Sequence, residues 1–143
     1  MALVIVSAKN IKEAYEKSLY KKEKEAYIVE DNELQDFFFF YKDSFKYYEY
    51  YYKLNPDGIS KIDAAEVIYV KLFAENVMKF IENNNEIENI IIDKFNVSKT
   101  KVRKYIEKLI KLSDFAIKNC DELIGLGDWE IKIWRSYNWR TII

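Results

Sequence analysis

The sequence has no histidine and only one cysteine among its 143 residues. The absence of histidine excludes imidazole bases, histidine-based catalytic triads and the usual Cys/His zinc sites. Cys120, the only cysteine, cannot form a disulfide within the chain, which is typical of a reducing compartment. No Asp/Glu cluster has the spacing of a calcium loop. We therefore expect no enzymatic activity, no cofactor and no metal.

Long apolar runs and a glycine-rich loop are also missing. No apolar segment approaches the ~20 residues that span a bilayer, and the N-terminus lacks the features of a signal peptide. The three glycines, Gly58, Gly125 and Gly127, do not form a phosphate-binding loop. Half of the residues are hydrophobic and a third are charged, which is typical of a globular protein. We expect a cytoplasmic protein that does not bind membranes.

The charged residues are segregated along the chain. Residues 94–111 contain seven basic side chains and one acidic side chain, a net charge of +6. Because the whole chain has a net charge of −1, the remaining residues together carry −7. This segregation is typical of a protein that approaches a polyanion with one face. The alternative is a solvated helix face without a partner.

The basic segment follows a predicted turn between two helices. Asn96 is suited to the left-handed conformation that closes a helix, and Ser98 to the N-cap of the next helix. The first helix is indicated by apolar residues at helical spacing, namely Ile87, Ile90, Ile91 and Phe95. Residues 86–112 therefore predict two helices joined by a tight turn.

This segment resembles the helix-turn-helix of small transcription regulators. The matching residues are Ile90 with Ile91, Asn96, Val97 with Ser98, Thr100 with Val102, and Leu109. The resemblance implies that the second helix enters the major groove of DNA. The alternative is an ordinary helical hairpin in a core.

The second helix supplies the predicted DNA-binding residues. Val102, Ile106 and Leu109 define its buried side, which leaves Thr100 and Lys104 pointing outward. Glu107 also points outward and would repel phosphate. The predicted site consists of Lys99, Thr100, Lys101, Arg103, Lys104 and Lys108.

At the N-terminus, residues 2–6 and 26–29 read as strands because they are short, apolar and rich in β-branched residues. Asn10 and Glu13 form a capping-box pattern that opens a helix between them. These strands could pair with each other in parallel, with C-terminal strands, or with a second copy of the chain. A sheet this small leaves free edges, so we expect a homodimer.

The next two segments predict long helices. Eleven of the sixteen residues from 37 to 52 are aromatic, and the polar exceptions follow one stripe, which predicts a largely buried helix over residues 32–54. Stacking of its tyrosines on single-stranded bases is the alternative. Ser60 with Asp63 predicts the start of another helix, which ends near Glu82 and is broadly apolar. We expect that helix to be the central scaffold.

The C-terminal region predicts a helix end and a hairpin. Helical periodicity persists to Leu123, and the glycines of residues 125–128 are interpreted as a helix stop. Residues 129–142 alternate as two strands around a turn. This hairpin resembles the wing of winged-helix proteins, with Lys132, Arg135 and Arg140 as candidate DNA contacts. It could equally complete the N-terminal sheet.

Together these patterns predict an α+β, mainly helical protein, with a winged-helix-like helical core and a small sheet formed by the N-terminal strands and the C-terminal hairpin. Residues 1–58 and 59–143 would form two parts of one compact domain. The predicted function is binding of double-stranded DNA and regulation of transcription. The alternative is a protein-interaction module that acts on a partner such as RNA polymerase. The many Ile, Lys, Tyr and Asn residues suggest a virus or mobile element with an AT-rich genome.

Overall fold

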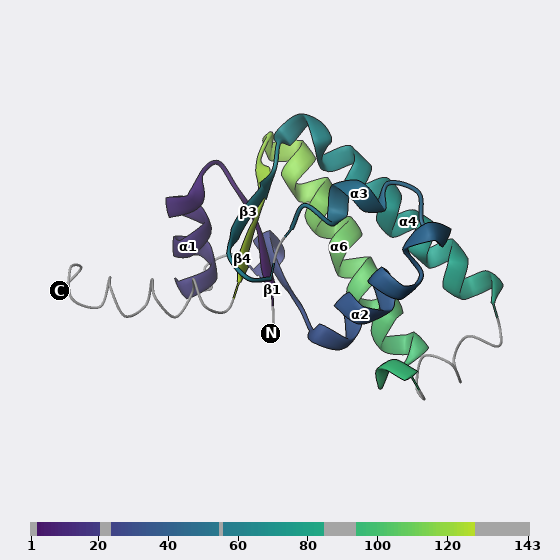
Figure 1. Cartoon of the computed structure of the whole chain (residues 1–143). Helices are drawn as coiled ribbons and strands as arrows, with labels where there is room; N and C mark the ends of the chain where they lie inside the picture. Colours follow the sequence, from purple (N-terminus) through teal and green to yellow (C-terminus); the bar gives the residue numbers. More distant parts are fainter. Residues whose placement is uncertain (1–2, 21–23, 55, 85–93, 128–143) are drawn as a thin grey trace.

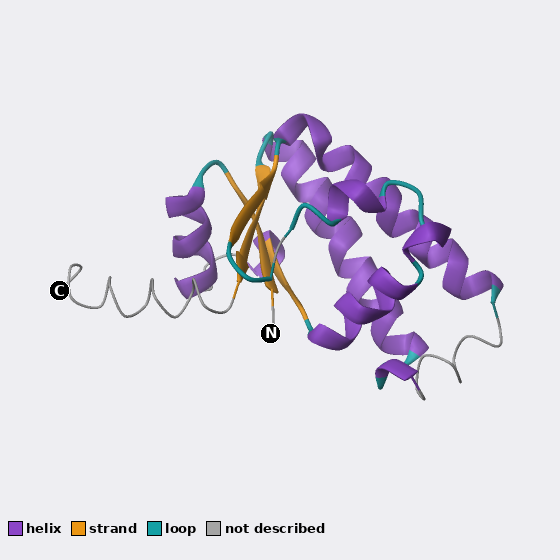
Figure 2. Ribbon diagram, in the orientation of Figure 1, coloured by secondary structure: helices purple, strands orange, loops and turns teal. Residues whose placement is uncertain are grey.

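The computed structural model describes residues 3–20, 24–54, 56–84 and 94–127. They form an α+β fold that is mostly helical and contains a four-stranded antiparallel sheet (Figure 2). The elements, in chain order, are β1 (Leu3–Ala8), α1 (Ile11–Tyr20), η1 (Lys24–Ala26), β2 (Tyr27–Glu30), α2 (Asn32–Phe40), η2 (Lys42–Ser44), α3 (Tyr48–Tyr51), β3 (Ile59–Ile62), η3 (Ala64–Glu66), α4 (Val67–Asn83), α6 (Lys99–Asn119) and β4 (Glu122–Gly127).

The sheet has the strand order β2-β1-β4-β3. β1 lies inside the sheet, where Ile5 is opposite Ile28 of β2 and Gly125 of β4. Helix α1 covers one face, and α2, α3, α4 and α6 lie on the other side (Figure 1). The two N-terminal strands thus pair with each other, antiparallel rather than parallel. Both strands have partners within the chain, so unpaired N-terminal strands no longer support the expected homodimer. The homodimer stays a prediction.

Two strands replace elements that the sequence predicted as helical. Ser60 lies in β3, so the helix predicted from this residue begins later, at Val67 of α4. Gly125 and Gly127 lie in β4 and do not end a helix. A β-carbon on Gly125 would lie 2.5 Å from Ser60 Oγ, and one on Gly127 would lie 2.2 Å from the Pro56 carbonyl oxygen. Glycine is required at position 127, where the β-carbon would meet backbone atoms, and a β-carbon at position 125 would crowd the Ser60, Leu54 and Leu3 side chains.

The aromatic segment is also broken, so the prediction of one helix over residues 32–54 is wrong. Tyr47 has a left-handed backbone with φ 67°, and it separates η2 from α3. Because of this break, aromatic side chains that precede and follow Tyr47 point into the same core. Phe37, Phe38, Phe45 and Tyr51 are buried there. Phe39, Phe40 and Tyr52 are more than half exposed.

Helices α4 and α6 pack against each other through apolar faces. Helix α4 buries Val70, Phe73, Val77 and Ile81 and also contacts α3, which confirms its central position. Helix α6 buries Val102, Ile106 and Leu109, as predicted. It extends beyond Leu112 to Asn119 and ends at Cys120, whose φ is 55°, so the prediction that helical structure continues to Leu123 is wrong.

Candidate nucleic-acid interface

The turn before α6 has the local geometry that the sequence predicts. Asn96 has φ 55°, in the left-handed region. Ser98 Oγ accepts a hydrogen bond from the Lys101 backbone N–H over 3.1 Å, which satisfies one of the free donors of the first helical turn. The predicted first helix, with Ile87, Ile90 and Ile91, lies outside the described residues. The cap and the left-handed turn are therefore confirmed, and the helix pair stays a prediction.

Helix α6 places all six predicted DNA-binding residues in its first three turns. Thr100, Lys101, Arg103, Lys104 and Lys108 are exposed, and Lys99 is half-buried. The opposite side is anchored in the core by Val102, Tyr105, Ile106 and Leu109. The wing candidates Lys132, Arg135 and Arg140 lie outside the described residues.

Ion pairs define the two flanks of the exposed face of α6. On one flank, Lys101 Nζ lies 2.9 Å from Asp31 Oδ2 at the start of α2. That hydrogen bond raises the pKa of Lys101 above its ordinary value. On the other flank, Asp114 Oδ1 lies 2.7 Å from Lys71 Nζ of α4. The strip of helix between these pairs is exposed and includes Thr100, Lys104, Glu107 and Lys108.

A groove of about 760 Å³ runs between α6 and β2. Its α6 wall carries a row of lysines, namely Lys101, Lys104, Lys108 and Lys111. Its β2 wall is formed by Tyr27, Ile28 and Val29, with Glu25 and Asp31 at the ends of the strand. Among the described residues no ion pair involves Lys104, Lys108 or Lys111. These three lysines can therefore neutralise an incoming anion without breaking a contact within the described fold.

A buried polar cluster behind this groove was missed by the sequence analysis. Glu30 is 2% exposed and accepts a hydrogen bond from the Tyr51 hydroxyl, which lies 2.6 Å from the Tyr105 hydroxyl. Burial raises the pKa of Glu30 to about 8, against a lowering effect of its hydrogen bond with Gln35. Burial also raises the pKa of Tyr105. The alternation of β2 is the signal that could have placed Glu30 on the buried side with Ile28.

The part of the chain that the structure describes contains no group of three Asp, Glu or Cys side chains that could hold a metal ion. Within the same residues, every helix is too short or too polar to cross a membrane. Comparisons of the chain with protein-family models, with curated proteins and with solved structures found no match.

Proposed function

We propose that this protein binds double-stranded DNA through the exposed face of α6 and regulates transcription, as its resemblance to helix-turn-helix regulators implies. The observation that carries the proposal is the row of basic side chains on one rigid, capped helix in a chain whose other parts are acidic. A concentrated positive face attracts the phosphate backbone at long range and releases its counterions on contact.

The spacing of the free lysines suits a nucleic-acid backbone. Lys104, Lys108 and Lys111 follow one another at helical spacing, so the outer two are separated by about 10 Å along the axis at ~1.5 Å per residue. The major groove is about 12 Å wide and accepts one helix. We propose that Lys104, Lys108 and Lys111 contact phosphates, and that Thr100 and Arg103 reach base edges.

Two side chains limit this contact. Glu107 is exposed among the lysines and would repel phosphate if it approached closely. Lys101 is paired with Asp31, and its release to a phosphate would leave that carboxylate beside the anion. Affinity should therefore depend on Lys104 and Lys108 more than on Lys101. The winged-helix arrangement remains part of the proposal, with residues 129–142 as the wing.

Titration of the whole protein into random duplex DNA at several salt concentrations tests the proposal. If three or four phosphates are contacted, log affinity should fall against log salt with a slope of about −3. Failure to bind at the lowest salt concentration, or binding that does not weaken with salt, would contradict a phosphate interface on α6.

The double substitution Lys104→Ala with Lys108→Ala is expected to lower the magnitude of that slope by about 1.8, since each lost contact removes about 0.9. Stability should change by about 0.5 kcal/mol or less because both side chains are exposed. The matched control is Lys12→Ala with Lys46→Ala, which removes the same charge from exposed positions outside α6. Equal effects of the two pairs would show that net charge, not this face, determines binding.

A protein partner is the second candidate, and the exposed edge of β2 favours it. Within the described residues β2 pairs with β1 alone, and Val29 is 46% exposed. An extended peptide could add to this edge, and the lysines of the groove would favour acidic side chains on it. An extended peptide of alternating Glu and Val should then bind, while its Lys-for-Glu counterpart should not. Binding of neither peptide would remove this candidate.

A further inference from the structure

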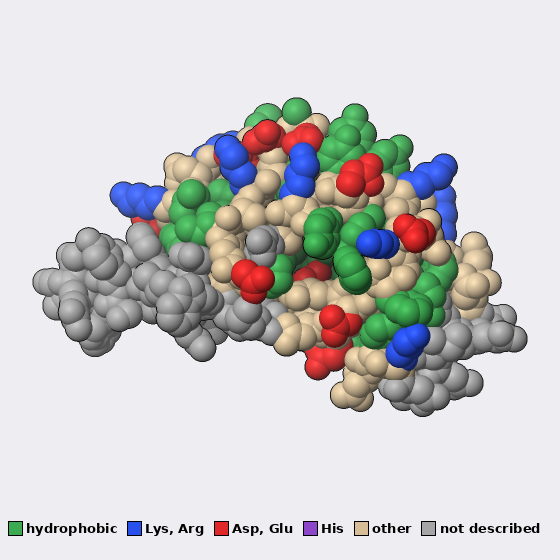
Figure 3. All heavy atoms as spheres, in the orientation of Figure 1, with side chains coloured by type: hydrophobic (Ala, Val, Ile, Leu, Met, Phe, Trp, Pro, Cys, Tyr) green, Lys and Arg blue, Asp and Glu red, His purple; other side chains and the backbone are tan. Residues whose placement is uncertain are grey.

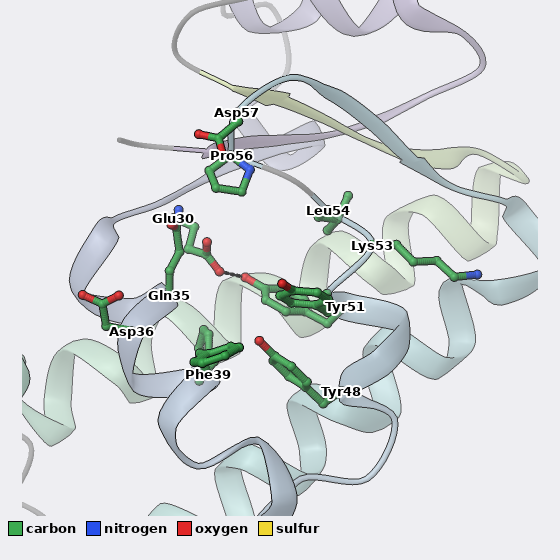
Figure 4. A pocket seen from close by; sticks show the side chains of 12 residues that line it. Glu30, Gln35, Asp36, Phe39, Tyr48, Tyr51, Lys53, Leu54, Pro56 and Asp57 are labelled. Atoms are coloured by element: carbon green, nitrogen blue, oxygen red, sulfur yellow. Dashed lines mark hydrogen bonds between the residues drawn. The ribbon is translucent and has the colours of Figure 1, made fainter.

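A second hollow lies on the other side of Glu30, between α2, α3 and the turn that precedes β3 (Figure 4). Its volume is about 410 Å³. Its walls contain five aromatic side chains, namely Phe38, Phe39, Tyr48, Tyr51 and Tyr52. The space-filling view shows hydrophobic side chains on this face of the molecule, with both acidic and basic side chains beside them (Figure 3). We refer to this hollow as the aromatic pocket.

Three carboxyl groups line the aromatic pocket. Glu30 is buried and points toward the Tyr51 hydroxyl, and the Tyr48 hydroxyl points toward the same space (Figure 4). Asp36 and Asp57 are exposed lining residues. Among the described residues that line the pocket, Lys53 is the only basic one. Its Nζ lies 3.0 Å from Glu66 Oε2. The lining is thus mainly aromatic and acidic, and the Phe39 ring already attracts one cation of the chain, since Lys42 Nζ lies 4.3 Å from the centre of that ring.

We propose that the aromatic pocket binds an organic cation through its alkylammonium group. Aromatic faces attract a cation by their quadrupole, most strongly where water is excluded, and groups of such rings recognise quaternary ammonium ions. The carboxylates of the lining residues Asp36 and Asp57 also attract a cation and disfavour an anion, and Glu30 adds to this attraction when it ionises. The alkylammonium group could belong to a small free amine or to a methylated lysine of another protein. The proposal does not depend on DNA binding.

Binding should be linked to proton release from Glu30. Its burial raises the pKa of the free protein's carboxyl to about 8, so the group is mainly protonated at neutral pH, and a bound cation favours the carboxylate. The charged and polar groups around Glu30 are the adjacent Asp31, Gln35 of α2, Tyr48 and Tyr51 of α3, and Tyr105 of α6. Burial raises the pKa of Tyr48 to about 12 and that of Tyr105 above its ordinary value, so these two phenols stay protonated. Affinity should therefore rise from pH 6 to pH 8.

Calorimetric titration with choline and with 3,3-dimethyl-1-butanol, its uncharged isostere, tests the charge requirement. Choline should bind about ten times more tightly than the isostere, and more tightly at pH 8 than at pH 6. A peptide with Nε-trimethyllysine, titrated in parallel, identifies the source: tighter binding than choline indicates a protein partner, and weaker binding a small amine. Equal binding of choline and its isostere, or binding of none of the three, would overturn the proposal.

Matched variants locate the binding site. Phe39 and Phe40 are adjacent and equally exposed, at 51% each, but only Phe39 lines the aromatic pocket. Phe39→Leu should weaken choline binding about three-fold to ten-fold, and Phe40→Leu should leave it unchanged.

Glu30→Gln keeps the side chain's shape and should abolish the pH dependence of binding. Equal effects of the two phenylalanine variants, or an unchanged pH dependence in folded Glu30→Gln, would contradict this site.

Discussion

Replacing Phe38 with alanine is expected to lower the free energy of unfolding by about 3–5 kcal/mol, as large aromatic deletions in cores do. Phe38 is 1% exposed. Its ring centroid lies 5.6 to 6.4 Å from four rings on different parts of the chain, those of Phe45, Tyr51, Phe73 and Tyr105. A cavity here would remove packing from α2, α3, α4 and α6 together. Urea denaturation monitored by circular dichroism measures the loss.

The adjacent residue provides the control for this variant. Phe39 is 51% exposed, and its substitution by alanine leaves no enclosed cavity, so the expected cost is below about 1 kcal/mol. If the two substitutions cost the same, the order of the aromatic side chains along α2 differs from the one described. A small cost for Phe38→Ala alone would show that the surrounding rings close the cavity.

The protein is expected to lose stability as the pH rises from about 5 to 8 because of Glu30. The pKa of Glu30 is raised from its ordinary value of 4.5 to about 8 by burial. Below the ordinary value the carboxyl is protonated in both the folded and unfolded states. Between the two values only the unfolded state releases the proton, so the free energy of unfolding falls by about 1.4 kcal/mol per pH unit. The contribution of protonated Glu30 to the free energy of unfolding is therefore fully present at low pH and is lost as the pH rises to about 8.

Glu30→Gln should remove this component of the pH dependence, because the amide does not ionise and can still accept a hydrogen bond from Tyr51. Denaturation at several pH values measures it. Asp36→Asn makes the same chemical change at an exposed position of α2 and should leave the slope in place. A slope that persists in Glu30→Gln would mean that the buried carboxyl is not the responsible group.

The features that the sequence predicts correctly depend on signals contained within one element. The buried face of α6 follows from apolar spacing, with Val102, Ile106 and Leu109 at helical intervals. The Ser98 cap and the left-handed Asn96 follow from the chemistry of single residues. Such local patterns do not require knowledge of the neighbours in the fold.

The features that the sequence analysis misses depend on distant neighbours. Gly125 and Gly127 are ambiguous alone, and their role in β4 is apparent only from the closeness of Ser60 and Pro56. The break at Tyr47 is favoured because α2 and α3 can then bury their rings together, although the residues between them permit a helix. The Glu30 cluster joins β2, α3 and α6, whose residues lie far apart in sequence. No local pattern relates these three positions.

The central claim, that the exposed face of α6 contacts duplex DNA, is tested most directly by amide chemical-shift mapping of isotope-labelled protein. On addition of a short duplex, the largest shifts among the described residues should fall between Ser98 and Lys111, and α1 on the far side of the sheet should change little (Figure 1). These shifts should reverse when salt is added, because the contacts are phosphate contacts. Shifts centred on α1 or on the aromatic pocket, or no shifts at low salt, would contradict the account.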